Sequence, residues 1–121
     1  MRQFLGLLLV LLCFGHLSLA ANTAPTLAQR IIAAERMGSG LKADASHRAA
    51  SFLSEAQLNA GTSFTIRGGD DVARELLQTP GGMNGKSGIF EYILDPTKGV
   101  IHQRFIPGGG ITGTPNQVVP R

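Results

Sequence analysis

The sequence contains a single cysteine, Cys13, and this residue lies within the first twenty positions. A domain formed by the rest of the chain therefore has no disulfide, no thiolate metal ligand and no cysteine nucleophile. Clusters of histidine and aspartate with the spacing of a metal site are also missing from the sequence. We therefore expect a fold that is held by its hydrophobic core and a chemistry that needs neither a metal nor an organic cofactor.

The sequence also has no hydrophobic run long enough for a membrane span. Residues 4–14 read FLGLLLVLLCF, whereas a spanning helix needs about 20 apolar residues. Arg2 precedes this run, and Ser18 and Ala20 occupy the −3 and −1 positions of a cleavage site, the order typical of a secretory signal peptide. We therefore predict that residues 1–20 are removed and that the protein is secreted, to the periplasm or outside the cell, without a stable membrane anchor.

The remaining 101 residues differ in composition between their two halves. Residues 23–60 are rich in alanine and contain only two glycines, whereas residues 61–121 contain twelve glycines and several short apolar runs. A helical half followed by a strand-forming half is the pattern of an α+β domain with segregated layers. We therefore predict one α+β domain, with N-terminal helices followed by a meandering antiparallel sheet.

Two helices are predicted in the first half. Apolar residues at helical spacing indicate a first helix over residues 25–37, ended by Gly38. A second helix is predicted over residues 45–60 with Asp44 as its N-cap, and His47 projects from its polar side. The face of this second helix that is predicted to enter the core comprises Ala49, Phe52, Leu53 and Ala56.

Three segments of the second half have the β-branched and aromatic residues typical of strands, namely residues 62–67, 88–94 and 100–106. Residues 71–78 fit either a short helix or a strand, and the turn that precedes them favours the strand. Residues 80–88 are predicted to form a flexible loop, residues 95–99 a hairpin loop, and residues 111–114 a short edge strand.

Side-chain alternation along the hairpin of residues 88–106 predicts what lies on each face of the sheet. Glu91, His102 and Arg104 are expected to converge on one face, but a slip of one residue in the pairing would place Tyr92 beside His102 instead. The residues predicted to pack against the helices are Phe90, Tyr92, Leu94, Ile101 and Phe105.

A carboxylate, an imidazole and a guanidinium on one sheet face can together cleave a phosphodiester. Glu91 would take the proton from a ribose 2′-hydroxyl, and His102 would protonate the leaving 5′-oxygen. Arg104 would hold the phosphate, and Thr112 would donate a further hydrogen bond. The same three strand residues also fit an ordinary solvated face, on which surface pairing contributes little to stability.

A modest basic surplus accompanies these candidates. The formal net charge is +3, and Arg48 and Lys86 are candidate substrate-binding cations. This balance is permissive for RNA binding without demonstrating it. The glycines of the segment IPGGGITG fit turns rather than a phosphate-binding or dinucleotide-binding loop.

The run GKSGIFEYILDPTKGVIHQRFIPGGGITGTPNQVV, residues 85–119, resembles the C-terminal toxin modules of bacterial polymorphic and contact-dependent inhibition toxins. The upstream segments LKADASHRAASFL and TSFTIRGGD are similar to the beginning of such a module, which extends the resemblance from residue 41 to the end. It implies a barnase/EndoU/RelE-like ribonuclease fold and a metal-independent endoribonuclease that acts on tRNA or other RNA in a competing cell. It also implies a cognate immunity protein. The positions that match the motif are His47, His102, Arg104 and Thr112.

On this interpretation the chain consists of a signal peptide (1–20), a helical lead-in (21–40) and a toxin domain (41–121), and it is a monomer when free. Such modules usually end very large proteins, whereas this one follows a signal peptide directly. Two other interpretations therefore stay open, a toxin remnant that has lost its activity and a non-enzymatic secreted domain that binds a protein or glycan through its glycine-rich loops.

Overall fold

The structure is a computed structural model and describes residues 23–120 of the chain. The predicted signal peptide lies outside the described residues. Within the described residues, no helix is both long enough and apolar enough to cross a membrane.

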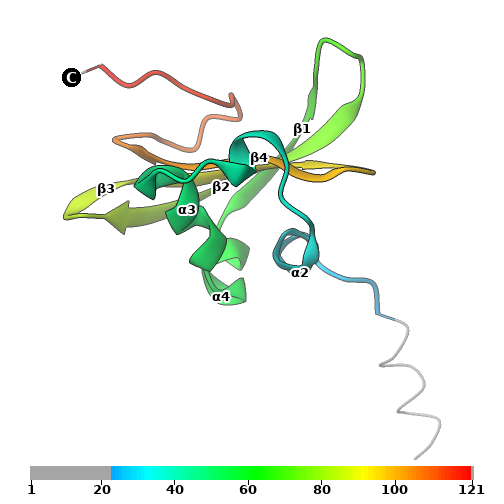
Figure 1. Cartoon of the computed structure of the whole chain (residues 1–121), viewed down its shortest axis with the longest axis horizontal. Helices are drawn as coiled ribbons and strands as arrows, with labels where there is room; N and C mark the ends of the chain where they lie inside the picture. Colours follow the sequence, from blue (N-terminus) through cyan, green and yellow to red (C-terminus); the bar gives the residue numbers. More distant parts are fainter. Residues whose placement is uncertain (1–22, 121) are drawn as a thin grey trace, which may run out of the picture.

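The fold is α+β, as predicted, with short helices followed by a four-stranded antiparallel sheet in the order β1-β2-β3-β4. The strands are β1 (Thr62–Arg67), β2 (Ala73–Met83), β3 (Lys86–Asp95) and β4 (Gly99–Pro107). Figure 1 shows the α-helices on one side of the sheet and the C-terminal segment, residues 108–120, on the other. We call the side of the sheet that carries the helices the helical face. The side that carries the C-terminal segment is the outer face.

The first helix, α2 (Leu27–Ala33), is shorter than predicted. It begins at Thr26, whose hydroxyl accepts from the amide of Gln29 while the Gln29 side chain accepts from the amide of Thr26. This capping box fixes the start of the helix. After Ala33 the chain becomes extended and runs beside β4, where Met37 N donates to Val100 O (2.9 Å) and Val100 N donates to Glu35 O (2.8 Å).

The prediction of one continuous helix over residues 45–60 is wrong. This stretch forms α3 (Ala45–Ala49), the 3-10 turn η2 (Ala50–Phe52) and α4 (Glu55–Asn59). The break follows from Ser54, which starts α4 with a capping box to Gln57 and leaves Leu53 extended. As a consequence Phe52, predicted to enter the core, is 75% exposed.

Residues 73–78 form a strand, as favoured, but β2 then continues to Met83 through part of the predicted loop. Pro80 is tolerated there because β1 pairs with β2 only as far as Gln78, so Pro80 has a strand partner on one side alone. The actual turn is Asn84-Gly85, with φ angles of 54° and 78°. Asn-Gly with two positive φ angles is the preferred pair for a two-residue hairpin.

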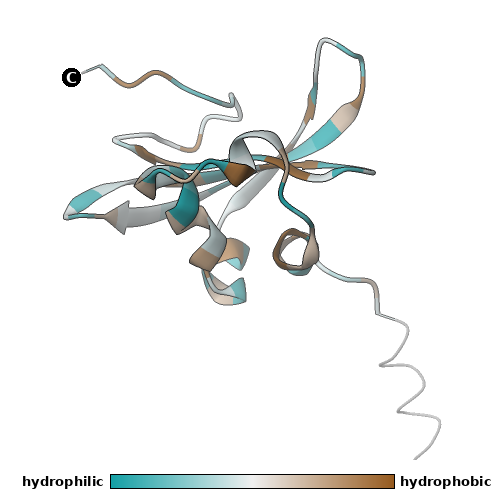
Figure 2. Ribbon diagram, viewed as in Figure 1, coloured by the Kyte–Doolittle hydropathy of each residue, from teal (hydrophilic) through white to brown (hydrophobic). Residues whose placement is uncertain are grey.

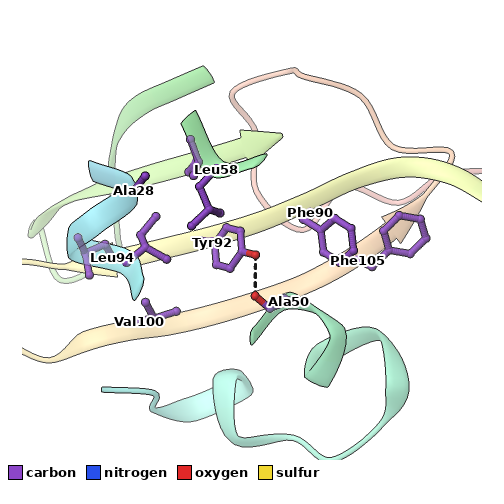
Figure 3. Packing of buried hydrophobic residues seen from close by; sticks show 10 residues of the cluster. Ala28, Ala50, Leu58, Phe90, Tyr92, Leu94, Val100 and Phe105 are labelled. Atoms are coloured by element: carbon purple, nitrogen blue, oxygen red, sulfur yellow. Dashed lines mark hydrogen bonds between the residues drawn. The ribbon is translucent and has the colours of Figure 1, made fainter. Parts of the chain in front are cut away.

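The core lies between the helices and the helical face of the sheet (Figure 3). Tyr92 is completely buried, and its hydroxyl donates to Ala50 O at 2.6 Å. The rings of Phe90 and Phe105 lie 5.0 Å apart between centroids. Figure 2 shows that α2, which contributes the buried Ala28 and Ile31 to this core, is largely hydrophobic.

One face assignment in β4 needs correction. The register between β3 and β4 shifts between Ile93, which pairs with His102, and Leu94, which pairs with Val100. Ile101 is the extra residue, so it does not take its predicted place in the core, and Val100 takes that place instead. A bulge of this kind changes the face of every residue on one side of it.

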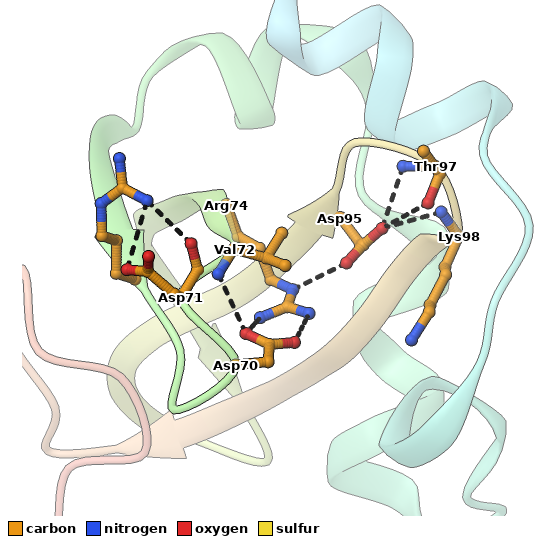
Figure 4. Close-up of polar contacts among 8 residues, drawn as sticks. Asp70, Asp71, Val72, Arg74, Asp95, Thr97 and Lys98 are labelled. Atoms are coloured by element: carbon orange, nitrogen blue, oxygen red, sulfur yellow. Dashed lines mark hydrogen bonds and ion pairs between the residues drawn. The ribbon is translucent and has the colours of Figure 1, made fainter.

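An ion-pair network joins the ends of the strands at one edge of the molecule (Figure 4). Arg74 donates to Asp95 at 2.7 Å and to Asp70 at 2.6 Å. Asp95 also accepts from the amides of Thr97 and Lys98, each at 2.9 Å. These backbone hydrogen bonds, with the guanidinium of Arg74, hold the pKa of Asp95 well below its usual range. The network fixes the β1–β2 turn against the β3–β4 turn.

Candidate functional site

The outer face of the sheet carries a buried hydrogen-bonded pair, Glu91 on β3 and His102 on β4. Their side chains meet with His102 Nε2 at 2.9 Å from Glu91 Oε1. Glu91 is 0% exposed and His102 is 7% exposed. The predicted convergence of Glu91 and His102 on one face is confirmed. The slip in register that would have placed Tyr92 beside His102 does not occur, because Tyr92 pairs with Gln103.

Both oxygens of Glu91 accept hydrogen bonds. Oε1 accepts from His102 and from the amide of Asn116 (2.9 Å), and Oε2 accepts from Gln78 Nε2 (2.8 Å). Burial by itself raises the pKa of Glu91, but the hydrogen bonds from His102, Asn116 and Gln78 outweigh it, and the pKa lies below its ordinary value. Glu91 is therefore a carboxylate at neutral pH.

This ionised partner determines how His102 carries its proton. A carboxylate only accepts hydrogen bonds, so His102 Nε2 must donate to it. In the neutral imidazole Nδ1 is then an acceptor, and the hydroxyl of Ser39 lies 3.0 Å from it. The pair thus presents a basic nitrogen to a hydroxyl group, which is the arrangement of a general base.

Ser39 reaches His102 from η1 (Gly38–Leu41), beside the edge strand β4. Gly38 makes this approach possible because its φ is +56° and a Cβ atom there would lie 2.8 Å from Ile101 O. Ser39 was missed in the sequence analysis. The signal that could have found it is its position between two glycines in the segment Gly38-Ser39-Gly40, since serine in a tight turn is well placed to project its hydroxyl.

Gln78 of β2 is the second residue that sequence reasoning missed. It is 0% exposed and pairs directly with Glu91 in the sheet. Its Oε1 accepts from the amides of Thr112 (2.9 Å) and Gly113 (3.0 Å), and its Nε2 donates to Thr114 O (3.1 Å) as well as to Glu91. Gln78 therefore attaches the C-terminal segment to the buried pair.

The C-terminal segment crosses the outer face without forming a strand, so the predicted edge strand over residues 111–114 is wrong. The amides of Thr112, Gly113 and Asn116 donate to the side chains of Gln78 and Glu91 and not to a neighbouring strand backbone. Thr112 contributes its amide to this network, while its hydroxyl is engaged with Thr114.

Arg104 lies on the same face, two residues along β4 from His102 and directly opposite Glu91 in the sheet. Its Nε is buried and donates no hydrogen bond to any atom of residues 23–120. Its guanidinium makes one long hydrogen bond, 3.4 Å from Nη1 to Asn116 Oδ1, and within the described chain it forms no ion pair. Among the described residues, the guanidinium therefore has one unpaired donor and no ion pair.

Arg104 and Lys86 line one groove between the hairpin and the C-terminal segment. The groove has a volume of about 730 Å³, and the described residues along it include two cations and no carboxylate. The structure thus brings together two residues that were predicted separately, one as a phosphate-holding group and one as a substrate-binding cation. A groove of this charge suits an anionic ligand.

His47 does not join the His102 site. It lies on α3 at the helical face, where its Nδ1 is 2.8 Å from Asp44 and its carbonyl oxygen accepts from Gln103 Nε2 at 3.2 Å. Gln103 alternates with His102 along β4, so the two histidines lie on opposite sides of the sheet. Arg48, also on α3, is exposed and lies on the helical side as well.

The described part of the chain contains no group of three or more His, Cys, Asp or Glu side chains that could hold a metal ion. Comparisons with protein-family models, with curated proteins and with solved structures found no match for this chain. What the protein does must therefore be argued from the geometry of the site.

Proposed function

We propose that the protein is an endoribonuclease that cleaves RNA without a metal, with His102 as its catalytic base. The observation that supports this most strongly is the combination, on one sheet face, of an oriented imidazole and an arginine that has no ion pair among residues 23–120. The imidazole is held by Glu91 at 2.9 Å, and the arginine opens onto a groove that also contains Lys86. An acid–base group next to a free cationic site is what phosphodiester cleavage requires.

The reaction follows from this arrangement. A ribose 2′-hydroxyl would replace the Ser39 hydroxyl at His102 Nδ1, and the imidazole would take its proton. The 2′-oxygen then forms a bond to phosphorus while the bond from phosphorus to the 5′-oxygen breaks, leaving a 2′,3′-cyclic phosphate and a 5′-hydroxyl. The imidazolium returns its proton to the departing 5′-oxygen, and Arg104 opposes the charge on the phosphoryl oxygens. Lys86, further along the groove, contacts the flanking RNA backbone.

Glu91 has a different role from the one expected from the sequence. It was expected to take the ribose proton itself, but a side chain that is 0% exposed and has both oxygens engaged cannot meet a substrate. In the proposed mechanism Glu91 is a positioning residue. Its charge fixes the proton on Nε2 and stabilises the imidazolium as it forms.

The resemblance of residues 85–119 to bacterial toxin modules supports the same class of reaction. It suggests a biological setting in which the secreted protein acts on tRNA or other RNA in a competing cell and is neutralised by a cognate immunity protein. Expression of residues 21–121, which retain every element that the structure describes, should then arrest growth and degrade RNA. Intact RNA and normal growth at high expression would overturn the proposal.

His102→Ala tests the catalytic assignment. We expect the rate of cleavage of a labelled RNA to fall by about 100-fold to 10,000-fold, because the acid–base group is lost. His47→Ala is the matched control, since it removes the other described histidine from the opposite side of the sheet and should leave the rate within a few-fold. Equal losses in both variants would place the chemistry elsewhere.

The contact of Ser39 with His102 favours a second candidate function, the hydrolysis of an ester by a serine nucleophile. Ser39, His102 and Glu91 form a continuous chain of a hydroxyl, a base and an acid at 3.0 and 2.9 Å. In this case a fluorophosphonate probe should label Ser39, and His102→Ala should prevent the labelling. If Ser39→Ala retains RNA cleavage and the probe labels nothing, the ribonuclease proposal stands alone.

A further inference from the structure

A second basic hollow lies on the helical side of β4, away from the groove of Arg104. Its volume is about 310 Å³, and it is lined by η1, α3 and η2. Two large apolar side chains that border it are exposed to solvent, Phe52 at 75% and Leu41 at 69%. Phenylalanine is usually buried, and an exposed one beside a hollow needs an explanation.

Phe52 is held in this exposed position by the local backbone. The capping box of Ser54 ends the preceding helix and leaves Leu53 extended, which turns Phe52 away from the core. Two of the lining residues are tied together by Gln103, which is 0% exposed, donates to Ser51 Oγ at 2.7 Å and accepts from Arg36 Nε at 2.8 Å. These hydrogen bonds fix the backbone and side chains next to the Phe52 ring.

The charge around the ring has one sign. Arg36, Lys42 and Arg48 are the charged residues among the described residues that line the hollow. Within residues 23–120, Lys42 and Arg48 form no ion pair. The neighbouring carboxylate of Asp44 is engaged by Ser46 and His47. An exposed aromatic ring surrounded by free cations is the combination that binds single-stranded nucleic acid.

The hollow is also close to the proposed reaction site. Gly40 lines it, and the adjacent Ser39 has its hydroxyl 3.0 Å from His102 Nδ1. A chain that passes the imidazole can therefore cross the edge of β4 at η1 and reach Phe52. Arg104, two residues along β4 from the same histidine, lines the other groove together with Lys86.

We propose that this hollow is a base-binding subsite for the RNA substrate, in which the ring of Phe52 stacks on a base next to the cleaved linkage. Arg48 and Lys42 contact the flanking phosphates, and Leu41 covers the edge of the base. The inference rests on the proposed ribonuclease function, which it deepens by adding Phe52 as a substrate-positioning residue. A base inside a duplex is already stacked on its neighbours, so the subsite favours an unpaired base. Stacking on the ring tolerates any of the bases.

The test uses a fluorescent single-stranded oligonucleotide with 2′-O-methyl groups, which the proposed reaction cannot cleave. Its affinity for the purified protein is measured by fluorescence anisotropy. Phe52→Ala should weaken binding by about 5-fold to 100-fold, as expected for the loss of one base–aromatic stack. Phe52→Trp should retain the affinity, while Phe52→Leu, which keeps the apolar bulk without a ring, should not. Arg48→Ala should weaken binding and lower the salt dependence by about one phosphate contact.

Ile32→Ala is the matched control, because Ile32 is an apolar residue of α2 that is 49% exposed and does not line the hollow. Equal binding by Phe52→Ala and the unaltered protein would overturn the subsite, and the face would then serve a protein partner or none. Equal binding by the leucine variant would also overturn it, since the contact would not be stacking. A protein that binds the oligonucleotide through Phe52 yet never cleaves RNA would retain the subsite and refute the ribonuclease proposal. A protein that cleaves RNA without any dependence on Phe52 would retain the ribonuclease proposal and refute the subsite.

Discussion

Glu91 and Asp95 lie four residues apart on β3, and both carboxylates are buried, but they are held by different kinds of partner. Asp95 accepts from the amides of the adjacent turn and from Arg74, whose charge is permanent. Glu91 accepts from side chains and an amide of β2, β4 and the C-terminal segment, and one of them is an imidazole. The first network consists of permanent charges and backbone amides, whereas the second contains an imidazole that can exchange a proton.

The charged residues that line the cavities beside the two carboxylates also differ. The hollow beside Asp95, of about 490 Å³, is lined by cations and carboxylates together. The groove beside the Glu91–His102 pair has Arg104 and Lys86 without a carboxylate among its described residues. Burial of a charge on its own therefore does not identify a site in this protein. What distinguishes Glu91 is its contact with the imidazole of His102, which in turn contacts the hydroxyl of Ser39. The nearby guanidinium of Arg104 has no ion pair among the described residues.

The sharpest test of this contrast replaces each carboxylate with its amide. Glu91→Gln should lower RNA cleavage by about 100-fold or more while the protein stays folded, because the neutral amide no longer fixes the proton on His102 Nε2. Asp95→Asn should lower the melting temperature and leave the cleavage rate nearly unchanged. In that variant an amide group must either face Arg74, which is also a donor, or lose the hydrogen bonds from the turn.

Cleavage rates at a temperature well below both melting points, together with circular dichroism, separate the two effects. If Glu91→Gln cleaves RNA normally and only melts earlier, then Glu91 is as structural as Asp95. The contrast between the two networks would then have no functional meaning.

The next largest effect should come from Gln78→Leu, which removes the residue that links Glu91 to the C-terminal segment. We expect a loss of roughly 2–3 kcal/mol in the free energy of unfolding, because buried partners are left without hydrogen bonds. The amides of Thr112 and Gly113 should also exchange faster with solvent. Urea unfolding and hydrogen exchange measure the two results.

Thr79→Val is the matched control for this prediction. Thr79 is also completely buried on β2, but it faces the helices and donates one hydrogen bond to Gln57 O at 2.7 Å. Its replacement should cost about 1 kcal/mol and leave exchange in the C-terminal segment unchanged. Slow exchange at residues 112 and 113 in Gln78→Leu would show that the segment is held by other contacts.

The fold was predictable from the sequence where the signal is local. The β-branched runs of β1 and β4, and the alternation that brings Glu91 and His102 to one face, are properties of single strands and one hairpin. The helix break at Ser54 was readable in principle, since serine followed by glutamine three residues later is a capping box. A continuous apolar stripe over residues 45–60 outweighed that signal.

The rest of the candidate site depends on contacts between residues far apart in the sequence. Ser39 reaches His102 across 63 residues and Gln78 reaches Thr112 across 34. No periodicity within one element encodes these distances. The β-bulge that moves Ile101 out of the core depends on how two strands pair, and alternation along one strand cannot reveal it.

The pH dependence of stability gives a third way to compare the networks. The pKa of folded Glu91 lies below the ordinary value of 4.5, so the unfolded chain binds its proton more readily than the folded one. The stability that this carboxylate contributes is therefore complete above about pH 5 and is lost as the pH falls through the folded pKa. The difference in unfolding free energy between the unaltered protein and Glu91→Gln should shrink over that interval. Two parallel curves from pH 7 to pH 3 would show that folding does not shift the titration of Glu91.

The smallest effect is expected at a third carboxylate, Glu75 of β2, which pairs with Arg30 at 2.6 Å on the surface. The two side chains are 38% and 43% exposed, so water and salt screen their attraction, in contrast to both buried carboxylates. Glu75→Gln should therefore change the free energy of unfolding by at most about 1 kcal/mol, and 0.5 M sodium chloride should abolish most of the difference. A larger, salt-independent loss would mean that this pair belongs to the same structural network as Asp95. The contrast would then lie between one edge of the molecule and the outer face, and no longer between exposed and buried carboxylates.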